Sequence, residues 1–115
     1  MNYKSKLRGL SVRQLRARRL RLAHAVPDLE GTLRGALQRQ MRRCGKPGCR
    51  CAEGDLHGPY IYVSVRTGGR SRLLYVPGPV VDAVTRHVEA TGRIEAALAE
   101  ISAINLELLA RGELA

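Results

Sequence analysis

The chain contains no tryptophan and no phenylalanine among its 115 residues, so large aromatic side chains contribute little to its interior. A core must therefore be assembled from Leu, Val, Ile and Ala, and a chain of this length has room for one modest core. Proteins this small often gain stability from a metal ion, a disulfide or a second subunit. We therefore expect a single domain over 1–115 that draws on one of these additional sources.

A membrane span and a signal peptide are also missing. No run of 18 apolar residues is present, which argues against a transmembrane helix. Lys4, Lys6 and Arg8 lie near the N-terminus, but the apolar segment of a secretory signal does not follow them. We expect a cytoplasmic protein without membrane contact. In a reducing compartment, three neighbouring cysteines are more often metal ligands than disulfide partners.

No set of catalytic residues is recognisable in the sequence. His24 and His87 lie in predicted helices without a nucleophile nearby, and the basic half of the chain has no paired carboxylates. Tyr60 and Tyr62 invite comparison with the tyrosine nucleophiles of DNA-cleaving enzymes. Those enzymes need a metal-binding or activating cluster for the tyrosine, which the 115 residues do not show, so we expect a protein that is not an enzyme.

Acidic residues are scarce where basic residues are abundant. Residues 1–76 hold 17 of the 20 basic residues and four acidic ones, whereas residues 77–115 hold three arginines and six acidic residues. Arginine outnumbers lysine by 17 to three, and its planar guanidinium suits bidentate contact with phosphates and base edges. This distribution is typical of a phosphate-binding surface and predicts DNA or RNA as the partner. An acidic protein or a membrane surface is the alternative.

The apolar pattern divides the chain into a helix over 11–26, a β-rich unit over 31–77 and a helical segment over 79–111. Ser11 and Gln14 match a capping box at the start of the first helix. A narrow seam suited to another helix follows at Val12, Leu15, Arg19, Leu22 and Val26. The arginines on the other faces of this helix are either solvated or directed at phosphates.

The segment over 79–111 carries two apolar stripes separated by Gly92. The first consists of Val81, Val84 and Val88, and the second of Ile94, Leu98, Ile101, Asn105 and Leu108. The pattern predicts either one long helix with a weak point or two shorter helices. Asn105 either faces solvent or fixes the register of paired helices, and a homodimer through the helices is expected on the second interpretation.

A β-hairpin is predicted in the middle of the chain. Tyr60–Arg66 alternates between apolar and polar side chains, Gly68 and Gly69 indicate a turn, and Arg70–Val76 is a second strand. Residues 36–43 fit a helix or a strand equally well by pattern alone.

The three cysteines lie within eight residues, and His57 follows them. The spacing C-x4-C-x-C-x5-H offers three thiolates and one imidazole, a ligand set that forms closed structural zinc sites. We predict Zn²⁺ as the cofactor, held by Cys44, Cys49, Cys51 and His57. Reduced structural thiols and a redox or regulatory thiol are the alternatives, and His57 has the alternative of a hydrogen-bonded turn histidine.

Tyrosines and arginines of the hairpin form the predicted nucleic-acid surface. Tyr60, Tyr62 and Arg66 share one face of the first strand, and Arg70, Arg72 or Tyr75 joins them depending on register. Aromatic rings stack on bases while arginines contact phosphates. The surface is extended around the metal loop by Arg42, Arg43, Lys46 and Arg50. Alternatively, the tyrosines are half-buried against the helices and the arginines are only solvated.

The segment Arg43-Cys-Gly-Lys-Pro-Gly-Cys-Arg-Cys51, followed by His57-Gly-Pro-Tyr-Ile-Tyr62 and a strand ending in Tyr75-Val-Pro77, resembles an uncharacterised prokaryotic domain-of-unknown-function family of small basic proteins. Members of the family are often found near mobile elements. The resemblance covers 31–77 closely and implies a small β-unit between two helices that pair as a coiled coil, which favours a strand over 36–43. Met41 stands where the family commonly has an aromatic residue.

Together these observations predict an α+β fold, in which a three-stranded antiparallel sheet with a zinc loop is flanked by an N-terminal helix and a long C-terminal helix. The expected function is zinc-stabilised nucleic-acid binding, as an accessory or regulator of a mobile element. A protein-interaction adaptor with a basic sheet and an oligomerising helix is one alternative, and a cysteine-based redox sensor is the other.

Overall fold

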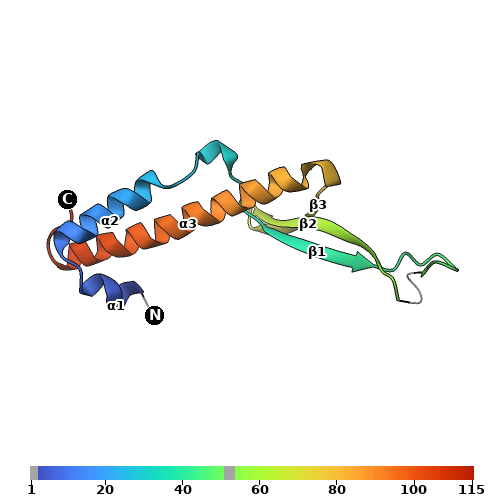
Figure 1. Ribbon diagram of the computed structural model, residues 1–115, viewed down its shortest axis with the longest axis horizontal. Helices are drawn as coiled ribbons and strands as arrows, with labels where there is room; N and C mark the ends of the chain where they lie inside the picture. The colour runs from blue at the N-terminus through green and yellow to red at the C-terminus, as the bar shows by residue number, and fades with distance from the viewer. Residues whose placement is uncertain (1–2, 51–53) are drawn as a thin grey trace. The chain divides into compact units, whose positions relative to one another are not determined.

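The structure is a computed structural model that describes residues 3–50 and 54–115. The elements in chain order are α1 (Tyr3–Arg8), α2 (Val12–His24), β1 (Ala36–Arg42), β2 (His57–Thr67), β3 (Arg70–Tyr75) and α3 (Val81–Ala110) (Figure 1). Short 3-10 helices at Leu29–Gly31 and Gly78–Val80 precede β1 and α3. The predicted α+β fold with a three-stranded antiparallel sheet is confirmed.

The chain forms two compact units. Unit 1 consists of Met1–Glu30 and Ala90–Ala115, and unit 2 consists of Gly31–Glu89, so α3 begins in unit 2 and ends in unit 1. Within the described ranges, none of the helices has the length and apolarity that a bilayer crossing requires. The single domain over 1–115 stays a prediction.

The capping box predicted for α2 is confirmed. The Gln14 backbone N–H donates to the Ser11 hydroxyl at 3.1 Å, and the Ser11 N–H donates to Gln14 Oε1 at 2.8 Å. These bonds satisfy two backbone donors that have no acceptor within the first turn. The helix ends at His24, two residues before the predicted end, and Ala25 is its C-cap.

The core of unit 1 is a cluster of aliphatic side chains from all three helices. It consists of Leu7, Leu15, Ala103, Ile104 and Leu108, with Leu10, Val12 and Leu22 packed against it. Figure 1 shows α2 lying along the C-terminal part of α3 in this unit. Leu15, Ile104 and Leu108 are completely buried, and each such side chain contributes roughly 1.5–3 kcal/mol.

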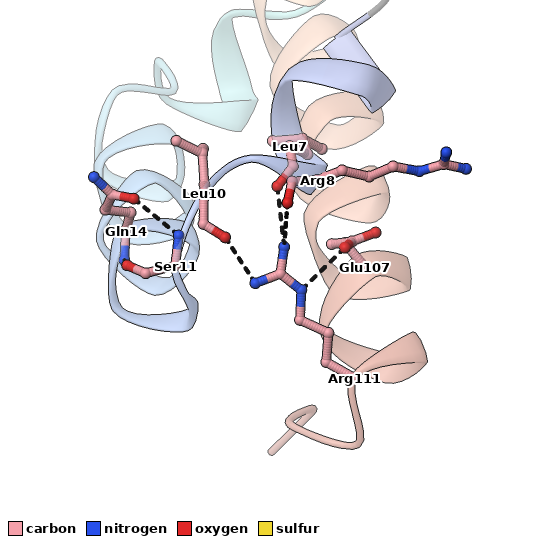
Figure 2. Close-up of polar contacts among 7 residues, drawn as sticks. All are labelled: Leu7, Arg8, Leu10, Ser11, Gln14, Glu107 and Arg111. Carbon is pink, nitrogen blue, oxygen red and sulfur yellow. Dashed lines mark hydrogen bonds and ion pairs between the residues drawn. The ribbon is translucent and has the colours of Figure 1, made fainter.

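Helix α1 was not predicted from the sequence, and Arg111 of unit 1 caps its C-terminal end (Figure 2). The Arg111 guanidinium donates to the carbonyl oxygens of Leu7, Arg8 and Leu10 at 3.2, 3.2 and 2.7 Å, and to Glu107 at 3.0 Å. Carbonyls at the end of a helix lack partners within it and carry partial negative charge. One planar cation therefore holds the connection between α1 and α2 against the end of α3.

Part of the positive charge of α2 is paired inside unit 1. Arg18 Nε donates to Glu100 at 2.6 Å, and an amino group of Arg16 lies 3.4 Å from a Glu113 carboxylate oxygen. Arg19 donates to Asn105 Oδ1 at 2.8 Å, so Asn105 links two helices of one chain. These arginines are therefore less available to a polyanion than the sequence pattern alone indicates.

Helix α3 runs through Gly92 without a break, which confirms the first of the two predicted alternatives. The predicted stripe is wrong at Leu98, which is 61% exposed, whereas its neighbour Ala97 is buried. Two adjacent helix faces carry leucines here, and the small side chains of Ala97 and Ala103 allow close packing on only one of them. Pairing with a second chain as a coiled coil stays a prediction; it would use the exposed Leu98, Leu106 and Leu109.

The sheet of unit 2 has the strand order β1-β2-β3. The predicted hairpin is confirmed, because Thr67 pairs with Arg70 and the two turn glycines, Gly68 and Gly69, both have positive φ. This is the geometry of a two-residue type I′ turn. The segment over 36–43, which the resemblance assigned to a strand, contains β1 and pairs with β2.

The pairing register separates two faces of the sheet. Leu37 lies opposite Val63 and Leu74 lies on its other side, and Val63 is buried. Gln38, Tyr62 and Tyr75 form a neighbouring row whose side chains point to the opposite face. One face is thus mainly aliphatic in its centre, and the other carries the tyrosines. We call the second one the tyrosine face.

A β-bulge ends the regular pairing of β1 with β2. Gln40 pairs with Tyr60 and Arg42 with His57, so Met41 lies opposite Gly58 and Pro59, which are joined by a cis peptide bond. Gly58 has a φ of +126°, and a Cβ there would lie 2.7 Å from the Gln40 carbonyl oxygen. Only glycine fits this position without displacing backbone. The bulge brings Arg42 and His57 together at one end of the sheet.

Candidate metal centre and nucleic-acid interface

The connection between β1 and β2, residues 43–56, carries most of the candidate metal ligands, and we call it the metal loop. Within it, the Cys49 N–H donates to the Lys46 carbonyl oxygen at 3.3 Å, with Pro47 and Gly48 between them. Gly48 has a φ of +77°, and proline followed by a glycine of positive φ is the arrangement of a type II turn. This turn, together with the positive φ of Gly45, reverses the chain so that Cys49 returns toward Cys44.

Cys44, Cys49 and His57 form a group that can hold a metal ion. Their ligand atoms all lie within 4.8 Å of one another, and Cys49 Sγ lies 3.1 Å from His57 Nε2. Since zinc lies about 2.0–2.3 Å from sulfur and nitrogen ligands, atoms that share one ion are at most about 4.6 Å apart. The three ligand atoms are therefore close enough to meet an ion after small shifts. Thiolate and imidazole donors suit zinc and not magnesium or calcium, which prefer oxygen.

The fourth predicted ligand, Cys51, lies outside the described residues. It follows Cys49 by two positions in the sequence. Among the described residues, the two cysteines and His57 offer three of the four ligands that a closed tetrahedral site would need.

A pocket of about 390 Å³ adjoins this group on unit 2. It is lined by residues from the end of β1, from β2, from β3 and from the metal loop: Arg42, Arg43, Cys44, His57, Tyr60, Tyr62 and Tyr75. Two of the candidate metal ligands, two arginines and three tyrosines thus share one cavity. Five of the ten residues predicted to contact nucleic acid line it.

The aromatic and basic side chains of the pocket contact one another. The Tyr62 and Tyr75 rings meet edge to face, with centroids 5.6 Å apart and planes at 68°. The guanidinium carbon of Arg42 lies 5.1 Å from the centroid of the Tyr62 ring, a cation–π distance. Arg42 is also held by Gln40, whose Oε1 accepts hydrogen bonds from Nε at 3.2 Å and from Nη2 at 2.7 Å.

The other predicted contact residues are distributed around this pocket. Lys46 and Arg50 are exposed in the metal loop. Arg66 lies on the tyrosine face further along β2, where it pairs with Ser71. Arg70 and Arg72 alternate with Ser71 on β3 and therefore point to the opposite face, while Tyr75 joins the tyrosines. The register thus brings Tyr75 to the site and leaves Arg70 and Arg72 away from it.

Gln40 is a site residue that the sequence analysis did not identify. It positions the Arg42 guanidinium over Tyr62, although it lies outside the loop that carries the cysteines. Its only signal in the sequence is the alternation of Gln38, Gln40 and Arg42 along β1, which shows a polar face once the strand is known.

Fold and site together define the class: a basic α+β protein with a Cys/His group and an arginine–tyrosine pocket at one end of its sheet. The family model described as "Domain of unknown function (DUF6788)" matches residues 12–86, which is more than half of the chain. The chain belongs to this family. This agrees with the predicted resemblance to an uncharacterised family. No curated protein and no solved structure matches the chain.

Proposed function

We propose that this protein is a zinc-stabilised nucleic-acid-binding protein and that the arginine–tyrosine pocket is the centre of its binding surface. The observation that carries the proposal is the meeting of Arg42, Arg43 and three tyrosines in one cavity beside a metal-binding group. None of the three strands contains an acidic residue. On the strands, a polyanion that approaches the sheet therefore meets cationic and aromatic side chains and no carboxylates.

Zinc has a structural role in this proposal. The loop between β1 and β2 places Lys46 and Arg50 near Cys49, and the described part of the loop has no α-helix or β-strand of its own. Zinc binding to structural sites in peptides supplies about 10–16 kcal/mol, comparable with the whole stability of a small domain. An ion on Cys44, Cys49, Cys51 and His57 would fix the loop and the adjoining wall of the pocket. The resemblance to a family found near mobile elements supports a role as an accessory or regulator of such an element.

A salt titration tests the proposal. Binding of a fluorescent oligonucleotide should weaken log-linearly with salt, with a slope of about −0.7 to −0.9 for each phosphate neutralised. Arg43→Ala should make the slope less steep by about 0.7–0.9, the contribution of one phosphate contact, because the exposed Arg43 lines the pocket. Arg93→Ala, an exposed arginine of α3 in unit 1, is the matched control and should leave the slope unchanged.

The two alternatives give different results. Absence of oligonucleotide binding at low salt contradicts the proposal and favours an adaptor that holds an acidic protein. Elemental analysis of freshly purified protein separates the zinc protein from the redox sensor. A folded, metal-free and oxidisable protein would support the sensor and contradict the structural zinc.

A further inference from the structure

The pocket is concave and small, and this restricts the form of nucleic acid that it can take. Its volume of about 390 Å³ lies at the low end of the range for small-molecule sites, about 300–1,000 Å³. Three tyrosines and two arginines line this one space. In a duplex, the faces of the bases are covered by their neighbours, and only edges and phosphates are presented.

One aromatic ring in the pocket is available for stacking. Tyr75 is 56% exposed, and its orientation is supported by the edge-to-face contact with Tyr62. The face of Tyr62 is occupied by the Arg42 guanidinium, so Tyr62 serves as a support for both neighbours. Tyrosine rings held in this way are platforms for unpaired bases, which stack irrespective of sequence.

The same pocket provides for a phosphate. Nε and Nη2 of Arg42 donate to Gln40 Oε1, and the guanidinium carbon lies 5.1 Å from the centroid of the Tyr62 ring. Nη1 is the guanidinium nitrogen that does not donate to Gln40, and it is therefore the donor that we assign to a phosphate oxygen. Arg43 is exposed on the same wall. The pocket thus offers a guanidinium, that of Arg42, close to an exposed aromatic ring, that of Tyr75. This pair suits a nucleotide, which joins a flat base to an anionic phosphate.

We infer that this pocket holds one unpaired base and its adjoining phosphate, with the base stacked on Tyr75 and the phosphate on Arg42 and Arg43. The inference rests on the proposed function and makes it specific: the ligand is single-stranded DNA or RNA, or an unpaired base in a loop or at an end. Bound duplex, the alternative, would use the arginines without the Tyr75 ring.

The test compares a 20-nucleotide single strand with the matching duplex, using the full chain purified with zinc. The single strand should bind more tightly than the duplex. Tyr75→Ala should weaken single-strand binding about 5- to 100-fold and leave duplex binding nearly unchanged. Leu73→Ala is the matched control, since Leu73 is a similarly exposed residue of the same strand face outside the pocket. Parallel DNA and RNA strands show which sugar is preferred.

A second measurement needs no variant. The chain has no tryptophan, and three of its four tyrosines line the pocket, so its ultraviolet fluorescence reports mainly on this site. Single strands should quench this fluorescence, and a strand with abasic sites, which retains its phosphates, should quench it much less. Equal affinity for single strand and duplex, with no quenching, would overturn the inference while leaving the proposed function intact. Absence of binding to every nucleic acid would overturn both.

Discussion

At the scale of single residues, one arginine side chain caps the C-terminal end of a helix, a position that is often capped by a glycine turn. Arg111 donates to the carbonyl oxygens of Leu7 and Arg8 in α1 and of Leu10 after it, and is anchored by Glu107, one turn earlier on α3. The five N–H donors of a guanidinium lie in a fixed plane, whereas the ammonium of lysine is a compact point charge. Leu7, whose carbonyl is one of the three, also contributes its side chain to the core of unit 1.

Arg111→Lys should therefore destabilise the protein although it keeps the charge. We expect a loss of about 1–3 kcal/mol in the free energy of unfolding, because the carbonyl oxygens of Arg8 and Leu10 would lose the guanidinium as a donor, whereas that of Leu7 would keep the Leu10 N–H. Urea denaturation measures the loss. Arg13→Lys, on an exposed residue of α2, is the control and should have little effect. Equal stability of Arg111→Lys and the wild type would show that the planar guanidinium is not needed.

Two properties determine which site residues could be predicted from the sequence: the chemistry of the residue type, and the face of the strand on which the residue lies. Cys44, Cys49 and His57 were found because few residue types bind metal and their spacing is short. Tyr75 and Arg72 were equal candidates, since the face of a β3 residue depends on a register that the turn and pairing determine. Gln40 was missed because a glutamine has no chemical signature before its partner, Arg42, is in place.

At the scale of elements, α3 combines an uninterrupted course with a glycine in its interior. Gly92 is exposed, and a Cβ built on it meets nothing within 4 Å. The glycine is therefore not required by packing, and it lowers the stability of the helix because it has more backbone freedom to lose than alanine.

Gly92→Ala should stabilise the protein by about 0.5–1 kcal/mol, and the melting temperature in circular dichroism should rise accordingly. The reverse change, Ala96→Gly at an exposed position of the same helix, should lower stability by a similar amount. A loss of stability in Gly92→Ala would indicate that α3 bends or opens at this position in solution.

Elements were predictable from sequence to the extent that local signals define them. The capping box of α2 and the glycine turn between β2 and β3 are local, and both were correctly predicted. Helix α1 has six residues and was missed, because so short a helix depends on its contacts through Leu7 and Arg111 and not on its own pattern. Leu98 belongs to the predicted apolar stripe and yet is exposed, because helical periodicity cannot choose between two adjacent apolar faces.

At the scale of the whole molecule, the two units should differ in their dependence on metal. The hydrophobic cluster of unit 1 draws all of its residues from α1, the connection to α2, α2 itself and the C-terminal part of α3. The Cys/His group belongs to unit 2, where the metal loop has few regular backbone hydrogen bonds among its described residues.

Chelation should therefore weaken nucleic-acid binding at least tenfold while most of the helical signal in circular dichroism is retained. Added zinc should restore binding. Cys49→Ser should reproduce the chelated state, and Ser102→Ala, an exposed residue of α3 in unit 1, is the control. Loss of the helical signal on chelation would show that the units do not differ in this way, and unchanged binding would exclude a structural role for the metal.

The discontinuous composition of unit 1 has a consequence for biosynthesis. Leu7 and Leu15 are translated before unit 2, but the side chains that bury them, Ile104 and Leu108, are translated after it. Unit 2 is continuous in sequence, and its synthesis precedes that of the second segment of unit 1. The cysteines are thus synthesised before the helical unit can close, and until then the positive charge of the arginines in α2 opposes aggregation of the exposed apolar side chains.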